Sequence, residues 1–217
     1  MKHIIVVSGG KTDDAFVDRV LREEKPELLI AADSGMEYFY RTGRKPDIII
    51  GDFDSAGTEA LAFFRGQPEI EIRQLVPEKD DTDTEAAIRL AISMGAESIT
   101  LLGATGCRLD HVLGNIELLG IGLKQHIPIV MCDAYNRIRM INHGITLHRE
   151  EQFGKYVSLI PYTEEVKELT LKGFKYPLER ARLKGFCSLG VSNEIVETEA
   201  EITFEEGILL VIESRDQ

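Results

Sequence analysis

Two aspartates stand directly after an apolar run in the segment IIIGDFDSA, residues 48–56. The run of β-branched residues is typical of a buried strand, so Asp52 and Asp54 fall where that strand ends. Mg²⁺ takes hard oxygen ligands and is commonly held by one or two carboxylates together with substrate phosphates. The pair therefore favours a metal–phosphate site over a purely structural turn.

The pattern recurs along the first half of the chain, where five of six expected strands are followed by a carboxylate. Besides Asp52 and Asp54, these acids are Asp33, Asp80, Asp81, Asp83, Asp110 and Asp133. In an open parallel sheet the carboxyl ends of the strands share one edge, where ligands bind. Two carboxylates ~6 Å apart repel by roughly 3 kcal/mol at an effective dielectric constant of about 20, so a crowded group calls for a cation. The arrangement predicts a Mg²⁺–phosphate site at this edge.

Aspartate is also common in turns and at helix N-caps, and this structural role competes with metal binding at every position. We assign Asp13 and Asp14 to the structural role. Asp81 fits both roles equally, because a helical pattern begins shortly after it.

Two glycine-rich turns, residues 6–14 (VVSGGKTDD) and 101–111 (LLGATGCRLDH), offer backbone N–H groups that can receive phosphate oxygens. Neither matches the P-loop or the dinucleotide fingerprint. Arg108 is placed to meet a phosphate, although spacing alone fits a surface arginine equally well. His111 is expected to pack or to form a hydrogen bond rather than to transfer protons.

The elements that must position these residues alternate between apolar strands and helices, which predicts a mostly parallel α/β sheet. The clearest helix, 83–94, carries a Thr82–Glu85 capping box and ends at Gly95, and a second helix covers 109–122. The expected strands are 3–7, 27–32, 47–50, 70–75, 98–102 and 127–131.

The rhythm changes between residues 132 and 142, after which alternating runs are broken by Gly, Pro and Asn. Stretches such as KYVSLIPY, VKELTLKG, LERARLKG and AEITFEEGILLVIES predict a small antiparallel β-sandwich without helices. We therefore expect an α/β domain over 1–135 and a β-sandwich domain over 136–217.

Composition narrows the class of partner. A formal net charge of −12 disfavours nucleic acid and anionic membranes. No apolar run approaches the ~20 residues of a membrane span, and the first residues fit a strand better than a signal peptide. Cys107, Cys132 and Cys187 are too scattered for a disulfide framework or a zinc site, which favours the reducing cytoplasm.

The motifs taken together resemble the thiamine pyrophosphokinase (thiamine diphosphokinase) family over nearly the whole chain. They are AADSG (31–35), PDIIIGDFDS (46–55), DDTDTEAA (80–87), GATGCRLDH (103–111), VSLIP (157–161), GFKYPL (173–178) and SNE (192–194). The resemblance implies a homodimer of α/β and β-sandwich domains, with thiamine bound near the subunit interface. It also implies a Mg²⁺-dependent reaction in which ATP and thiamine give AMP and thiamine diphosphate.

The resemblance also implies roles for particular residues. Asp33, Arg108 and Asp110 would contact substrate, with Tyr176, Ser192 and Asn193 near the thiamine. The metal ligands would be Asp52, Asp54, Asp80 and Asp83, and the catalytic carboxylates would be Asp54, Asp83 and Asp110. Cys107 stands where the family often has glycine, which leaves the shape of that loop open.

Two other interpretations remain at this point. A metal-dependent phosphohydrolase of the haloacid dehalogenase type also runs an apolar strand into DxD, although usually on its first strand. A non-catalytic Mg²⁺–nucleotide sensor would bind nucleotide without turnover.

Overall fold

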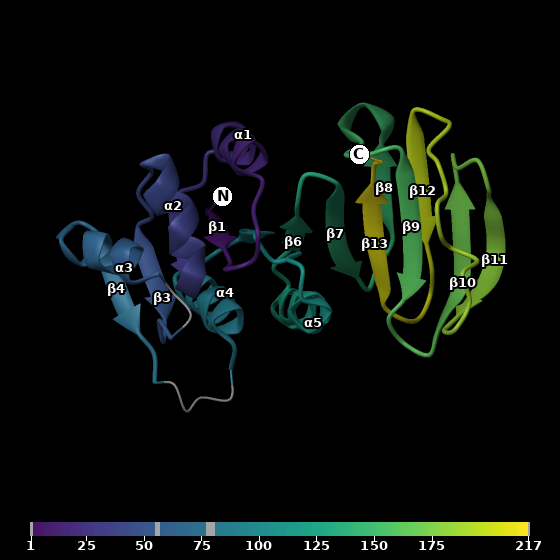
Figure 1. Ribbon diagram of the computed structural model, residues 1–217. Helices are drawn as coiled ribbons and strands as arrows, with labels where there is room; N and C mark the ends of the chain where they lie inside the picture. The colour runs from purple at the N-terminus through teal and green to yellow at the C-terminus, as the bar shows by residue number, and fades with distance from the viewer. Residues whose placement is uncertain (1, 55–56, 77–80, 217) are drawn as a thin grey trace. The chain divides into compact units, whose positions relative to one another are not determined.

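The computed structural model describes residues 2–54, 57–76 and 81–216. The chain divides into two compact units, residues 1–134 and 135–217, and Figure 1 draws the elements of each. Within the described ranges, none of the helices combines the length and apolar character needed to cross a bilayer.

The first unit contains the six parallel strands that the sequence predicts, in the order β4-β3-β2-β1-β5-β6. Every neighbouring pair among them is parallel. Their bounds are β1 His3–Val7, β2 Leu28–Ala32, β3 Ile48–Gly51, β4 Glu71–Gln74, β5 Ser98–Leu102 and β6 Ile129–Cys132. Residues Ile4 to Val7 of β1 are fully buried, which explains its continuous apolar run: both faces of a central parallel strand are covered.

Helices connect these strands, and the two with the clearest sequence patterns begin close to their predicted positions. They are α1 Asp14–Glu24, the short 3₁₀ helix η1 Asp33–Gly35, α2 Met36–Thr42, α3 Thr58–Arg65, α4 Asp83–Ser93 and α5 Leu109–Gln125. Thr82 caps α4 by accepting a hydrogen bond from the Glu85 backbone N–H at 3.2 Å, as the capping-box pattern predicts. Asp13 caps α1 in the same way, so its structural assignment is confirmed.

The second unit is a β-sandwich. One layer is the antiparallel set β7-β13-β9, and the other is the antiparallel sheet β11-β10-β12-β8. The bounds are β7 Asn136–Ile141, β8 Ile145–His148, β9 Tyr156–Pro161, β10 Glu165–Lys172, β11 Leu178–Lys184, β12 Glu199–Thr203 and β13 Leu209–Ser214, with the 3₁₀ helix η2 at Arg149–Glu151. Alternate residues such as Val157, Leu171 and Ile202 point inward and form its core.

Two details of this unit differ from the sequence pattern. β7 and β8 are absent from the stretches singled out as strands, and the long run 200–214 divides into β12 and β13. The division falls at a turn that contains Gly207, whose φ of 113° suits glycine because it has no side chain.

Candidate functional site

A cleft of about 510 Å³ lies in the first unit, among the loops that follow its strands. These loops come after β1, β2, β3 and β5, and the starts of α4 and α5 complete the wall. The lining includes Ser8, Gly9, Gly10, Lys11, Asp33, Ser34, Asp52, Asp81, Asp83, Thr84, Gly103, Gly106, Cys107, Arg108, His111 and Asn115. A cleft at the carboxyl ends of parallel strands is the position at which open α/β sheets bind ligands.

Three of the predicted acids meet in this cleft. Asp33 follows β2, Asp52 follows β3 and Asp83 begins α4, and each offers a carboxylate oxygen within 4.8 Å of those of the other two. The three residues are hereafter called the acidic cluster. The fold therefore brings together carboxylates that are up to 50 positions apart in the sequence. Such converging oxygen atoms are what a metal site requires.

The backbone around the acidic cluster allows this close approach. β2 and β3 run in parallel register, and a side chain at Gly51 would place its Cβ 3.0 Å from the Cα of Asp33. Asp33 and Phe53 both adopt left-handed backbone angles, with φ of 46° and 66°. Aspartate tolerates this conformation, whereas for phenylalanine it is strained, and strain of this kind concentrates at functional sites.

The environment of Asp33 is suited to a cation. Its side chain is 7% exposed, and in the described part of the chain its Oδ1 atom has no hydrogen-bond partner. Burial raises the pKa of the Asp33 carboxyl, the backbone N–H of Ser34 partly opposes that rise, and the charges of Asp83 and Asp52 add to it. A divalent ion would supply the missing partner and remove the repulsion, so the acidic cluster fits Mg²⁺.

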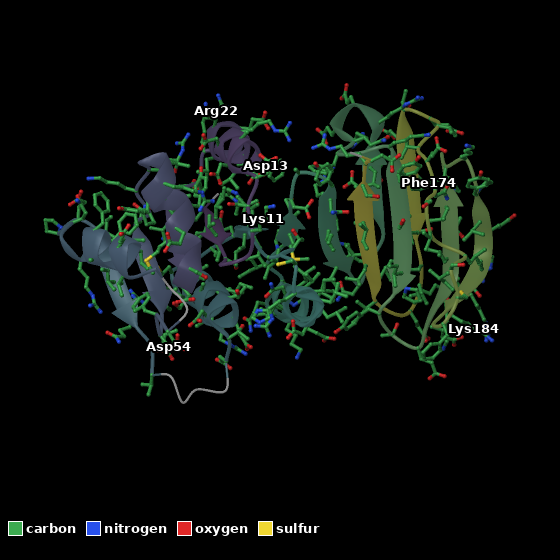
Figure 2. The ribbon with its side chains drawn as sticks, viewed as in Figure 1. Lys11, Asp13, Arg22, Asp54, Phe174 and Lys184 are labelled. Atoms are coloured by element: carbon green, nitrogen blue, oxygen red, sulfur yellow. The ribbon has the colours of Figure 1, made fainter. Side chains whose placement is uncertain are left out.

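The other predicted metal ligands lie differently. Asp54 is exposed in the turn after β3, where its N–H donates to Asp52 Oδ1 at 3.1 Å (Figure 2). It is outside the group of three oxygens, although its turn fixes the orientation of Asp52. Asp81 lines the cleft and lies 3.7 Å from Arg89, while Thr82 provides the helix cap. Asp80 falls outside the described residues.

Arg108 and Asp110 form an ion pair at the start of α5, with Nη2 of Arg108 2.6 Å from Oδ2 of Asp110. The hydrogen bond from Arg108 lowers the pKa of the Asp110 carboxyl, and the aspartate raises the pKa of Arg108 in turn. Both side chains are exposed, so the pair contributes little to stability. Arg108 lines the cleft and can exchange this partner for a phosphate.

In the second unit, the three predicted thiamine-contacting residues are neighbours. The backbone N–H of Tyr176 donates to Asn193 Oδ1 at 3.0 Å, and Asn193 Nδ2 donates to the Tyr176 carbonyl at 2.8 Å. Ser192 has a left-handed φ of 61°, and its N–H donates to Ser158 Oγ. The buried Asn193 therefore holds the segment that presents the ring of Tyr176, which is 60% exposed.

Sequence reasoning missed several residues that build the cleft. Thr84 Oγ1 donates to Ser8 Oγ at 3.0 Å and ties α4 to the end of β1, and buried Asn115 donates to the Ala104 carbonyl at 2.9 Å. Lys11 also lines the cleft. The glycine-rich turns drew attention to the loop that carries Ser8 and Lys11, but no spacing rule selects these side chains, or Thr84 and Asn115 on the helices α4 and α5.

A cleft with converging carboxylates at the strand ends of an α/β domain is typical of proteins that transfer phosphoryl groups through metal ions. Comparison with known families is more specific. Residues 21–131 match the family model described as the thiamin pyrophosphokinase catalytic domain, and residues 142–209 match its vitamin B1 binding domain. The chain belongs to the thiamine pyrophosphokinase family, whose members are diphosphotransferases.

Individual relatives agree with this assignment. A thiamine pyrophosphokinase of Bacillus subtilis is 35% identical over 217 residues and spans all of both chains. A crystal structure of that organism's enzyme superposes with a TM-score of 0.89 at 34% identity, with full coverage of both chains. A thiamin pyrophosphokinase structure from Geobacillus thermodenitrificans gives a TM-score of 0.85 at 35% identity, covering 99% of this chain and 98% of its own. Family membership decides against the phosphohydrolase and the non-catalytic sensor.

Proposed function

We propose that the protein transfers the pyrophosphoryl group of ATP to the hydroxyl group of thiamine, which yields thiamine diphosphate and AMP. The observation that carries this proposal is the acidic cluster, with its partnerless buried Asp33 oxygen, in the strand-end cleft of a chain from this family. The resemblance of the sequence motifs to this family implies the same reaction.

The acidic cluster would hold Mg²⁺, with Asp54 and Asp80 as further ligands from the neighbouring loops. When bound, the ion would neutralise the charge of the phosphates. The carboxylates of Asp33, Asp52 and Asp83 would hold it, because they come from three separate elements and converge on one point.

The reaction requires the thiamine oxygen to bond to the β-phosphorus of ATP while the bond from that phosphorus to the α-phosphate oxygen breaks. AMP leaves with the electron pair, and the hydroxyl proton passes to a carboxylate. The candidates for this base are Asp54, Asp83 and Asp110. Arg108, at the wall of the cleft, would neutralise phosphate charge.

Thiamine would be bound in the second unit by Tyr176, Ser192 and Asn193, in a homodimer. Support for the dimer comes from the segment 185–192, in which Phe186, Leu189 and Val191 are all exposed. Apolar side chains gathered on one exposed segment are typical of interaction surfaces. We place the enzyme in the cytoplasm, which suits its three free cysteines.

The test is a direct assay of purified protein with Mg²⁺, ATP and thiamine, in which AMP and thiamine diphosphate are measured together. Equal amounts of the two products are expected, and release of inorganic phosphate without thiamine diphosphate would contradict the proposal. Asp54→Asn should lower kcat about a hundredfold or more, with an unchanged circular dichroism spectrum. Asp13→Asn keeps a helix cap outside the cleft and should retain full activity. Wild-type kcat in Asp54→Asn would remove its proposed metal and catalytic role.

A further inference from the structure

We infer that Lys11 is a second phosphate-binding cation, which holds the part of the ATP phosphate chain that lies away from the acidic cluster. This inference rests on the proposed ATP-dependent reaction. It assigns Lys11 a positioning role that neither its sequence motif nor the family comparison supplies.

Lys11 lies on the loop after β1, in backbone contact with the loop that carries Arg108. The N–H of Gly10 donates to the Gly103 carbonyl at 2.8 Å, and a Cβ on Gly10 would lie only 2.4 Å from that oxygen. A Cβ on Gly106 would lie 3.1 Å from the Cα of Gly10. Only glycines allow the two loops to meet this closely, and the contact brings the backbone of Lys11 beside the Arg108 loop.

The backbone on either side of Lys11 is fixed. Before it, Gly10 is bound to Gly103. After it, the Thr12 hydroxyl donates to Asp14 Oδ1 at 3.0 Å and accepts from Arg41 Nη2 at 2.7 Å. The lysine therefore starts from an anchored backbone, which reduces the entropy that its side chain would lose on binding a ligand.

The side chain of Lys11 is exposed to the cleft and is uncommitted. Across the described ranges it forms no ion pair or side-chain hydrogen bond, whereas the other cleft-lining cation, Arg108, is already paired with Asp110. A lysine ammonium without a partner, at the wall of a cleft, is available to bind an anion as a point charge.

The cleft separates its charges along the sheet edge. Strand order β3-β2-β1-β5 places Asp52 and Asp33 on one side and Lys11 and Arg108 on the other. In Figure 2, Lys11 lies well apart from Asp54, whose N–H binds Asp52 of the acidic cluster. A bare triphosphate is repelled by the acidic cluster, so the phosphates that do not contact the metal should lie toward the two cations.

The experiment measures the Kd of ATP in the presence of Mg²⁺ and without thiamine, by isothermal titration calorimetry. Lys11→Gln should weaken binding by about tenfold to a hundredfold, the usual loss when a charged hydrogen-bond donor is removed. Lys11→Arg keeps the charge and should remain within a few-fold of wild type. Lys124→Gln removes a lysine at the opposite end of α5 from the cleft and should bind like wild type.

Steady-state kinetics provide the second reading. Lys11→Gln should raise the KM for ATP and leave the KM for thiamine unchanged, with the same melting temperature. Wild-type ATP affinity in Lys11→Gln would overturn the inference, as would an equal loss in Lys124→Gln. A wild-type protein that binds ATP but forms no thiamine diphosphate would contradict only the proposed function. The Kd values of ATP for the lysine variants would still test the role of Lys11.

Discussion

Asp33 combines burial, a left-handed backbone and a carboxylate oxygen without a partner among the described residues. The burial has an energetic cost, because a buried carboxylate with one oxygen left without a partner disfavours folding. The raised pKa of its carboxyl has the same origin, because burial disfavours the charged form. Asp33 therefore lowers the stability of the metal-free protein, and the same carboxylate is suited to bind a cation.

Substitution of Asp33 by Asn should make the metal-free protein more stable. With a raised folded-state pKa, the contribution of Asp33 to stability is fully present below its unfolded pKa and is lost as pH rises through the folded value. The gain of Asp33→Asn over wild type should therefore grow with rising pH, to about 1–3 kcal/mol. Urea unfolding in EDTA, at a series of pH values that starts below the unfolded pKa of aspartate, measures this difference in the free energy of unfolding.

The same unfolding series with added Mg²⁺ supplies the control. Mg²⁺ should stabilise the wild type and have little effect on Asp33→Asn, because a ligand stabilises the fold only as far as it binds it. A variant with the pH profile and the Mg²⁺ response of the wild type would contradict the assigned role of Asp33.

At the scale of elements, the start of α4 sets the position of Asp83. Thr82 caps the helix, and Asp83 lies in its first turn, so loss of the cap loosens one corner of the acidic cluster. Thr82→Ala should cost about 1 kcal/mol of stability and weaken the apparent affinity for Mg²⁺ in the kinase assay. Thr82→Ser retains the capping oxygen and should preserve both. An unchanged Mg²⁺ dependence in Thr82→Ala would show that the helix cap does not position Asp83 for metal binding.

Local patterns predicted the elements whose determinants are local. The start of α4 follows from Thr82 and Glu85, three positions apart, and the parallel strands from their apolar runs. The sequence pattern did not predict β7, because two of its six residues are arginines and charged residues are not expected in a buried strand. Arg137 and Arg139 both bind Glu213 of β13, at 2.6 and 2.7 Å, and that carboxylate is only 1% exposed. A partner so distant in sequence cannot be recognised from spacing.

The residues of the candidate site were likewise predictable where they lie next to their strand or helix in the sequence. The rule that acids follow strands identified Asp33, Asp52 and Asp83, because each lies next to its strand or helix in sequence. Strand order was not available from the sequence, and it is strand order that places β5 beside β1. For this reason Lys11 was missed as a neighbour of Arg108.

For the whole molecule, the net charge of −12 has a kinetic consequence. Thiamine carries a positive thiazolium ring, so the field of the protein should accelerate its encounter. Salt screens this field, and raising NaCl from about 20 mM to about 500 mM should lower kcat/KM for thiamine several-fold. Measurement at saturating ATP and Mg²⁺ isolates this effect. A salt-independent or rising kcat/KM would exclude steering.

Assembly is tested on the segment 185–192. Leu189→Asp should convert the proposed dimer into monomers in size-exclusion chromatography with light scattering, because it places a charge on an exposed apolar surface. The kcat/KM for thiamine should fall, while ATP affinity stays unchanged. Val196→Asp alters a similarly exposed valine outside the segment and should remain dimeric. A dimeric Leu189→Asp would place the interface elsewhere.

Cys107 has an exposed thiol at the wall of the strand-end cleft, whereas Cys132 is buried and Cys187 belongs to the other unit. An electrophilic group on a ligand that binds in this cleft would find a nucleophile at Cys107, which the glycine implied by the family resemblance does not offer. Such a ligand would form a covalent bond with this chain and would spare any relative that has glycine at this position.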